Sequence, residues 1–393
     1  MTAPLTGLRV VELARILAGP WIGQTLADLG ADVVKVESPD GDDTRRWGPP
    51  FVKGAEGEDL DAAYFHACNR GKRSVVADFR TEEGCELVRR LAGRSDVLVE
   101  NFRVGTLARY GLDHATLAAR NPRLVYCSVT GFGQDGPQAG RAGYDAMIQA
   151  ASGIMDLTGD PKGEPQKIGV AFMDIMTGLY GVIAIQAALA QREATGRGQH
   201  IDMALLDVGV AVLANQAMNY LVSGEAPRRL GNAHPNIAPY QAFPVADGHV
   251  VIAVGNDAQF GRLCELLALR DVARDDRFAT NAARVRNREV LAGILEAGLA
   301  NRRRGELLGS LEAAGIPAGP INTVRDVFAD PQVLHRGLLV QLAAAGVAGG
   351  KVPSVRTPIA FSDATLSLSR PSPRLGEHSV EVRRELGLEH PGP

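Results

Sequence analysis

The residue best suited to chemistry in this chain is Asp174, a lone carboxylate within the largely apolar stretch Ile168–Gly178. Two interpretations fit an aspartate there. It could cap the helix that the following residues predict, because an aspartate oxygen readily accepts the free N–H groups of a first helical turn. It could instead be a nucleophile whose apolar neighbours exclude water from a reactive intermediate. The residue pattern alone favours the cap.

Motifs that would assign other chemistry directly are missing. No G-x-G-x-x-G follows the first predicted strand, and neither a P-loop nor a G-x-S-x-G elbow is present. The four cysteines are scattered without a C-x-x-C, and no Cys/His cluster has metal-ligand spacing. We therefore predict free buried thiols, no metal, and no nicotinamide or flavin cofactor.

Composition narrows the function classes further. The chain has 393 residues, is 45% hydrophobic and 22% charged, and carries a formal net charge of -3. A dedicated nucleic-acid binder usually has a basic surplus, so we expect no nucleic-acid partner. No uninterrupted apolar stretch approaches the roughly 20 residues of a membrane span. The first residues lack a signal or transit pattern, and we expect a cytoplasmic protein that does not bind membranes.

The elements that position Asp174 are predicted to be alternating strands and helices. Helical patterns over residues 21–29 and 82–92 lie between β-branched runs, which indicates βαβ units and a mainly parallel sheet. The predicted strands cover residues 8–13, 32–37, 74–79, 96–101 and 124–129. Further helices are expected from about residue 178 and over 204–221. The fold class is therefore α/β, with a Rossmann-like large domain.

A Gly-, Pro- and Asn-rich break at 224–239 separates this part from a smaller α/β unit. A strand at 248–254 opens that unit, helices follow over 258–267, 288–300 and 305–314, and 316–322 forms a tight connection. The proline-containing C-terminal part has no sustained helical period and is expected to pack on the large domain. We predict a large domain over 1–222, an inserted small domain over 223–325, and a returning segment over 326–393.

The sequence resembles the class III CoA-transferases, also called the CaiB/BaiF family. Ordered local signatures carry the resemblance from about Leu5 to Leu386: residues 5–13, 18–20, 29–37, 41–45, 69–74, 99–102, 131–137, 143–145, Asp174 with Gly178, and 195–199. The resemblance implies a Rossmann-like large domain, a small domain, and a homodimer of two interlocked chains. Coenzyme A is then a co-substrate rather than a bound cofactor.

The resemblance also reverses the interpretation of Asp174, which matches the catalytic aspartate of the family. The implied chemistry is an aspartyl anhydride followed by an aspartyl-CoA thioester. The glycine-rich loop that supplies oxyanion donors in the family corresponds to Gly255, Asn256 and Gln259. This loop has a single glycine, so its mobility is left open. The alternative is an ordinary turn into a helix capped by Asp257.

Cations are expected along the CoA channel, because CoA carries a 3′-phosphate and a pyrophosphate. By position against the family, the predicted CoA-binding residues are Asp78, Phe79, Arg80, Asn101, Phe102, Arg103, Arg109, Tyr144 and Asp145. For each arginine the alternative is a solvated surface position.

Segments such as 141–145 and 317–322 resemble family members that move CoA from succinyl-CoA to dicarboxylates such as glutarate. The far carboxylate of such an acceptor needs a partner, for which the candidates are Arg15, Arg45, Arg141 and His234. The acceptor itself is left open. A racemase of the same superfamily is the alternative enzyme, but Tyr144 stands where that enzyme has a histidine base. A non-catalytic CoA-binding protein is the remaining alternative.

Overall fold

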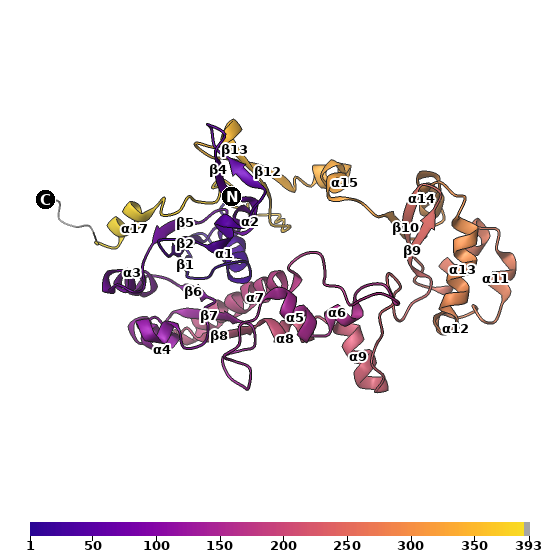
Figure 1. Cartoon of the computed structure of the whole chain (residues 1–393), viewed down its shortest axis with the longest axis horizontal. Coiled ribbons are helices and arrows are strands. Elements are labelled where there is room, and N and C mark those ends of the chain that lie inside the picture. The colour runs from indigo at the N-terminus through magenta and orange to yellow at the C-terminus, as the bar shows by residue number, and fades with distance from the viewer. Residues whose placement is uncertain (389–393) are drawn as a thin grey trace. The chain divides into compact units, whose positions relative to one another are not determined.

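The computed structural model describes residues 1–388, and Figure 1 traces their helices and strands. The chain groups into two compact units. Unit 1 comprises 1–152, 168–212 and the chain from 331 onward, and unit 2 comprises 153–167 and 213–330. The domain division predicted from the sequence stays a prediction, and its last segment, 326–393, ends outside the described residues.

A six-stranded parallel sheet forms the centre of unit 1, which confirms the predicted α/β class. Its order is β5-β2-β1-β6-β7-β8. The strands span β1 Arg9–Glu12, β2 Asp32–Glu37, β5 Arg73–Val76, β6 Val97–Glu100, β7 Val125–Thr130 and β8 His200–Ala204. The strand order reverses between β1 and β6, because the chain runs outward through β2 and β5 and then returns. In open α/β sheets, the carboxyl ends of the strands at such a switch point form a binding crevice.

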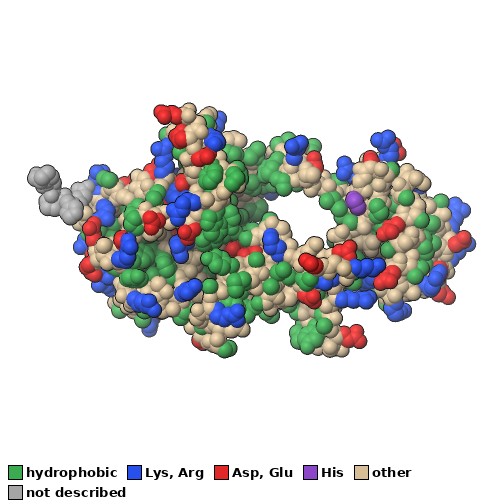
Figure 2. All heavy atoms as spheres, in the orientation of Figure 1, with side chains coloured by type: hydrophobic (Ala, Val, Ile, Leu, Met, Phe, Trp, Pro, Cys, Tyr) green, Lys and Arg blue, Asp and Glu red, His purple; other side chains and the backbone are tan. Residues whose placement is uncertain are grey.

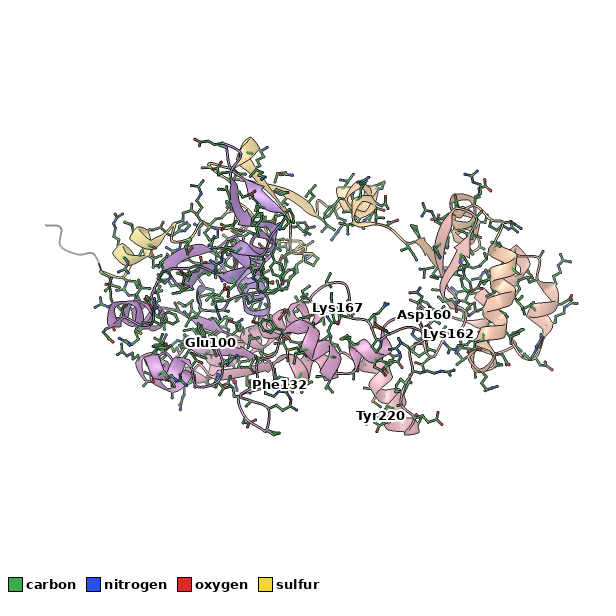
Figure 3. The ribbon with its side chains drawn as sticks, in the orientation of Figure 1. Glu100, Phe132, Asp160, Lys162, Lys167 and Tyr220 are labelled. Carbon is green, nitrogen blue, oxygen red and sulfur yellow. The ribbon has the colours of Figure 1, made fainter. Side chains whose placement is uncertain are left out.

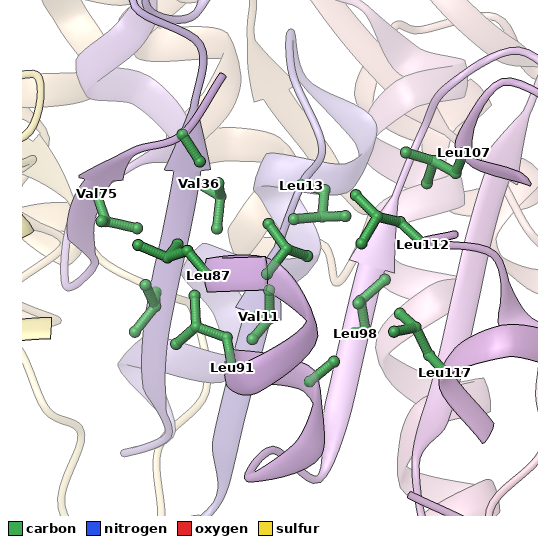
Figure 4. Close-up of a cluster of buried hydrophobic side chains, with 14 of the residues drawn as sticks. Val11, Leu13, Val36, Val75, Leu87, Leu91, Leu98, Leu107, Leu112 and Leu117 are labelled. Atoms are coloured by element: carbon green, nitrogen blue, oxygen red, sulfur yellow. The ribbon is translucent and has the colours of Figure 1, made fainter. Parts of the chain in front are cut away.

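Apolar side chains of two helices pack on this sheet, as Figure 4 shows. Helix α3 (Glu82–Gly93) brings Leu87 and Leu91, and α4 (His114–Arg120) brings Leu117. They meet strand residues such as Val11 and Leu98, and all of these are buried. Burial of each such side chain contributes about 1.5–3 kcal/mol. This core therefore fixes the strand ends around the crevice.

Helix α1 (Ala18–Asp28) packs along α7 (Phe172–Thr195), the helix that carries Asp174. Glycines permit the close approach. A Cβ on Gly178 would lie 3.0 Å from the Trp21 side chain, and one on Gly181 would lie 2.5 Å from Ile22. The N-terminal halves of the two helices are therefore held directly against each other.

By length and composition, α7 is also long and apolar enough to cross a membrane. The consecutive helices α8 (Leu205–Ala211) and α9 (Ala214–Ser223) would pass the same test if their 70° bent pair counted as one span. Because α7 packs along α1 and its residues such as Met173, Thr177 and Ile185 are buried, we assign it to the core of unit 1.

The remaining elements of unit 1 surround the sheet. They are η1 Asp43–Arg46, β3 Phe51–Lys53, β4 Asp59–Ala62, α2 Ala63–Cys68, η2 Leu107–Tyr110, α5 Asp145–Ala151, α16 Pro331–His335, β12 Leu339–Ala343, η3 Ala348–Gly350, β13 Lys351–Val355 and α17 Ser379–Glu385. The C-terminal helix docks through Arg73 of β5, whose guanidinium pairs with Glu381 and Glu385 at 2.9 and 2.8 Å.

Unit 2 is built on an antiparallel sheet of order β11-β10-β9. Its elements are α6 Ile154–Leu157, α9, β9 Tyr240–Val245, β10 Gly248–Ala253, α10 Asp257–Leu266, α11 Arg270–Arg274, α12 Asn281–Arg286, α13 Arg288–Leu299, α14 Arg304–Ala313, β11 Ala318–Pro320 and α15 Val324–Ala329. Side chains of the strands and of α10, α13 and α14 form its own buried core.

Candidate active site

A cavity of about 390 Å³ opens at the carboxyl ends of β1 and β6, where the strand order reverses. It brings together residues that the sequence places far apart. Its lining includes the predicted residues Arg15, Asn101, Phe102, Arg103, Arg141, Tyr144 and Asp174. A carboxylate, three arginines and two aromatic rings thus share one crevice, a combination suited to an anionic ligand and covalent chemistry.

Asp174 lies in the first turn of α7 but is not the cap of that helix. The N-cap position is Ala171, whose side chain cannot accept a hydrogen bond. The exposed N–H groups of the helix are satisfied from α5 instead: Asp145 Oδ1 accepts from Met173 N at 2.7 Å and from Asp174 N at 3.4 Å. Gln149 Nε2 in turn donates to Asp145 Oδ2 at 2.6 Å. The Asp174 carboxylate is left uncommitted: within residues 1–388 no group donates a hydrogen bond to it.

The environment of Asp174 raises its pKa from 3.8 to about 7. Burial is the larger cause, because it removes water from the charged form, and the negative charge of Asp145 adds to it. A carboxylate that titrates near neutral pH and is not used in a hydrogen bond is a better nucleophile than an ordinary surface aspartate.

The loop between β1 and α1 forms one wall of the cavity and is held in a strained conformation. Ile16 has a φ of 73°, which is rare for a β-branched residue. The Asn101 side chain clamps the preceding residue, accepting from Arg15 N at 2.9 Å and donating to Arg15 O at 2.6 Å. Asp42 accepts from Ile16 N at 3.3 Å. Asn101 thus holds the loop backbone and also lines the cavity, and its predicted contact with CoA stays a prediction.

A buried group of charges fastens the same loop and the first turn of α1. Lys35 Nζ donates to Ala14 O at 2.8 Å, and Lys72 Nζ donates to Pro20 O at 2.9 Å. Both lysines pair with Glu12, whose side chain is fully buried. Each buried charge therefore has an opposite partner, and loss of one partner would leave a costly uncompensated charge.

Glu100 supports the opposite wall of the cavity and was not singled out from the sequence. Its Oε2 accepts from Phe102 N at 2.8 Å, which fixes the start of the loop that follows β6. Burial raises the pKa of Glu100 to about 7. Its only sequence signal is a carboxylate at the end of a buried strand; Figure 3 labels its position.

The arginines of the cavity differ in how many hydrogen bonds and ion pairs they already form within the protein. Arg15 pairs with Asp43 at 3.0 Å in an exposed setting. Arg141 donates to the Gln138 side chain at 2.9 Å, and its guanidinium lies 5.3 Å from the Phe132 ring centroid. The side chain of Arg103 makes no hydrogen bond or ion pair with the described residues. Its charge is the most readily available for an incoming anion.

Other predicted binding residues lie outside this cavity. Arg45 is buried and pairs with Glu37 at 2.7 Å and Asp61 at 2.6 Å, so its guanidinium is already neutralised. The predicted contact of Arg45 with the substrate carboxylate stays a prediction, and these two ion pairs compete with it. The exposed Arg80 pairs with Asp78 at 2.8 Å.

A neighbouring ring cluster contains further predicted CoA residues. The ring of Phe79 lies near those of Phe102 and Tyr110, with centroids 6.0 and 6.1 Å away. Arg109 is exposed in η2, next to this cluster in sequence.

The predicted lid residues belong to unit 2. Gln259 Oε1 accepts from Gly255 N at 2.8 Å, and Asn256 caps α10 by accepting from Gln259 N at 2.9 Å. Asn256 takes the capping role that the sequence suggested for Asp257, which instead pairs with Arg284 at 2.7 Å. The oxyanion role of the loop stays a prediction.

His234 also belongs to unit 2, where its ring stacks on Tyr240 at a centroid distance of 5.2 Å. Burial and the charge of Arg288 lower the pKa of His234. A neutral ring is a weaker partner for a carboxylate than an imidazolium. Its predicted contact with the substrate stays a prediction.

Within residues 1–388, no group of three or more His, Cys, Asp or Glu residues could hold a metal ion. The four cysteines are free and buried.

Comparison with known proteins identifies the protein family to which this chain belongs. The chain matches CoA-transferase family III over residues 5–379. It therefore belongs to this family of CoA-transferases, as the ordered signatures of the sequence indicated.

The chain is also similar over most of its length to individual members of this family. The chain is 58% identical over 384 residues to the succinate–glutarate CoA-transferase of Agrobacterium fabrum, covering 98% of this chain and 96% of that protein. It is 41% identical over 384 residues to the human succinyl-CoA:glutarate CoA-transferase, covering 98% of this chain and 86% of that protein. The crystal structure of a CaiB/BaiF family protein from Brucella suis superposes with a TM-score of 0.87 at 63% identity, covering 98% of this chain and all of that one.

Proposed function

We propose that this protein transfers coenzyme A from succinyl-CoA to glutarate or a closely similar dicarboxylate, with Asp174 as the covalent carrier. The observation that carries the proposal is the uncommitted Asp174 carboxylate in a cavity lined by cations. Family membership and the relatives named for succinate and glutarate support the choice of donor and acceptor.

The reaction proceeds in four exchanges at the Asp174 carboxyl group. The carboxylate attacks the thioester carbonyl of succinyl-CoA, forming a mixed anhydride and expelling CoA thiolate. The thiolate attacks the aspartyl carbonyl, which gives an aspartyl-CoA thioester and releases succinate. Glutarate then attacks this thioester and expels the thiolate again. The thiolate finally attacks the glutaryl carbonyl, which yields glutaryl-CoA and regenerates the carboxylate. Each step exchanges one acyl bond for another and consumes no proton.

The cavity residues take distinct parts in this scheme. Arg103, with no partner among the described residues, is the foremost candidate to contact a CoA phosphate, and Phe102 and Tyr144 line the path of the pantetheine chain. Asp145 acts on the nucleophile through the helix cap, and the predicted contact of Asp145 with CoA stays part of the proposal. Arg15 and Arg141 are the candidates for the far carboxylate of the acceptor.

Residues outside the cavity complete the proposed CoA channel. They are Asp78, Phe79, Arg80 and Arg109.

We further propose a homodimer in which the small domain is inserted into the large one and two chains interlock. Apolar side chains that are exposed on two helices support this proposal, because a second copy of the chain would bury them. They include Ile183 of α7, 63% exposed, and Leu221 and Val222 of α9, 70% and 80% exposed. In such a dimer, the loop with Gly255 and Gln259 would supply oxyanion donors. The cytoplasmic location stays a prediction from the sequence.

An acceptor panel with succinyl-CoA as donor tests the proposed specificity. Glutarate should exceed a monocarboxylate of equal length, such as pentanoate, by at least about tenfold in kcat/KM, because only the dicarboxylate can engage a second cation. An Arg141→Met variant should remove most of this preference and leave turnover of pentanoate nearly unchanged. A wild-type enzyme that prefers pentanoate would contradict the dicarboxylate assignment.

A further inference from the structure

A second cavity, of about 510 Å³, lies wholly within unit 2 and takes no part in the proposed reaction. Three of its lining residues are arginines: Arg228, Arg229 and Arg288. In Figure 2, blue Lys and Arg side chains gather on this part of unit 2, near the segment of Asp160 and Lys162 labelled in Figure 3. Asp156 and Glu289 also line the cavity, so its three arginines outnumber its two carboxylates, and the whole group lies apart from Asp174.

The three arginines have different local roles. Arg229 builds the wall: its guanidinium donates to the carbonyl oxygens of Asp156, Asp160 and Gly163 at 3.1–3.2 Å, and it lies 3.6 Å from the Asp156 carboxylate. Its charge is paired with the Asp156 carboxylate, and three backbone carbonyls accept its N–H groups. Its role is to close the segment 156–163 around the cavity.

Arg288, the first residue of α13, is part-buried and carries an uncompensated charge. It donates to the backbone carbonyls of His234, Pro235 and Val285 at 2.9, 2.6 and 3.3 Å, and no carboxylate lies within ion-pair distance among the described residues. Burial and the nearby charge of Arg228 lower the pKa of Arg288, and Glu289 opposes them only in part. The protein thus holds two like charges close together at some cost.

Arg228 is the free member of the pair. Its side chain makes no hydrogen bond or ion pair with any residue in 1–388, although it is close enough to Arg288 to disfavour that charge. Arg228 and Arg288 also line a neighbouring cavity, so they stand between two openings. Asp156 and Glu289 also line the first cavity, but among the described residues neither carboxylate forms an ion pair with Arg228 or Arg288. Two unpaired guanidinium groups beside an open volume match the fork geometry that binds carboxylate and phosphate.

We propose that Arg228 and Arg288 form an oxyanion-binding site in unit 2, distinct from the Asp174 cavity. Its ligand is a small molecule or group bearing a carboxylate or phosphate. Such a ligand relieves the repulsion between the two guanidiniums and gains charge-assisted hydrogen bonds. The site stands independently of the transfer reaction, since none of its residues belongs to the proposed catalytic machinery.

Calorimetric titration of the full-length protein with inorganic phosphate, at constant ionic strength, tests this site. Wild-type protein should bind phosphate saturably, and Arg228→Met should weaken binding at least about tenfold, because one of two charged donors is lost. Arg228 makes no bond that the fold needs, so the variant should keep its melting temperature and its transferase activity. Arg286→Met, an exposed arginine of α12 outside both cavities, is the matched control and should bind as wild type does.

Two further measurements identify the chemical class of the ligand and confirm which cavity binds it. Arg103→Met should retain phosphate binding, which separates this site from the CoA cavity. Succinate that displaces phosphate identifies a dicarboxylate site, and phosphate that resists displacement identifies a phosphoryl site. Absence of saturable binding by both anions, or equal binding by Arg228→Met and wild type, would overturn the proposal. Neither result would bear on the transfer activity, which is assayed separately.

Discussion

Replacing Asp174 with asparagine should stabilise the protein at alkaline pH while abolishing CoA transfer. The reason is the environment of the carboxylate, which raises its pKa from 3.8 to about 7. Below pH 4 the group is protonated in both the folded and the unfolded state, so it carries no penalty. As the pH rises from about 4 to 7, the unfolded chain ionises first and folding becomes progressively less favourable. Above pH 7 the penalty is complete.

The size of this penalty follows from the separation of the two pKa values. At about 1.4 kcal/mol per pH unit, roughly three pH units give about 4 kcal/mol. Asp174 faces an open cavity rather than a closed core, so solvent screening reduces the figure, and we expect about 2 kcal/mol. Asparagine has nearly the shape of the neutral acid and carries no charge, so Asp174→Asn should recover this free energy.

The assay is thermal unfolding of wild type and Asp174→Asn at fixed protein concentration between pH 4.5 and 8.5. The melting temperature of the variant should exceed that of wild type at pH 8.5, and the difference should shrink towards pH 4.5. Asp135→Asn, which changes an exposed loop carboxylate, should show no such trend. An equal difference at all pH values, or a variant that is less stable at pH 8.5, would refute the reasoning about burial.

Three further changes probe the supports of the site. Asp145→Asn should keep the helix cap and shift the acidic limb of the pH profile of kcat/KM to lower pH, because it removes a negative charge near Asp174. An unshifted limb would show that the charge of Asp145 does not raise the pKa of Asp174. Arg103→Met should raise the KM for succinyl-CoA about tenfold or more, whereas Arg197→Met, at an exposed position, should leave this KM unchanged. Equal effects of the two substitutions would show that Arg103 does not bind a CoA phosphate. Gly23→Ala should lower the free energy of unfolding by about 3–5 kcal/mol, because its Cβ would lie 1.8 Å from the buried carboxylate of β1 and break its ion pairs. Gly93→Ala, with open space around it, is the control, and similar losses in both would contradict the clash.

The sequence predicted the fold best where the local pattern and the tertiary environment agree. The β-branched runs that became β1, β2, β5, β6 and β7 were recognised because both faces of a parallel sheet are apolar. Strand β8 was missed because His200 and Asp202 interrupt its apolar pattern, and pairing with β7 defines it instead. The predicted helix over 204–221 was wrong in one respect: it breaks between α8 and α9, where Ala214 takes a φ of 46° without a glycine or proline to announce it.

The site was predictable only in part, because contacts between segments that are distant in sequence determine its geometry. Asp174 could be singled out as an isolated carboxylate, but its freedom from capping depends on Asp145, 29 residues away in sequence. The strain at Ile16 and the pairing of Lys35 with Glu12 likewise arise from contacts between distant segments.

The most direct test of the account is chemical trapping of the acyl group on Asp174. Wild-type protein and Asp174→Asn are incubated with succinyl-CoA and hydroxylamine, digested, and analysed by peptide mass spectrometry. We expect an aspartyl hydroxamate on the peptide that contains Asp174, formed only in wild type and only when succinyl-CoA is present. A hydroxamate on another residue, or none under conditions of active turnover, would contradict a covalent role for Asp174.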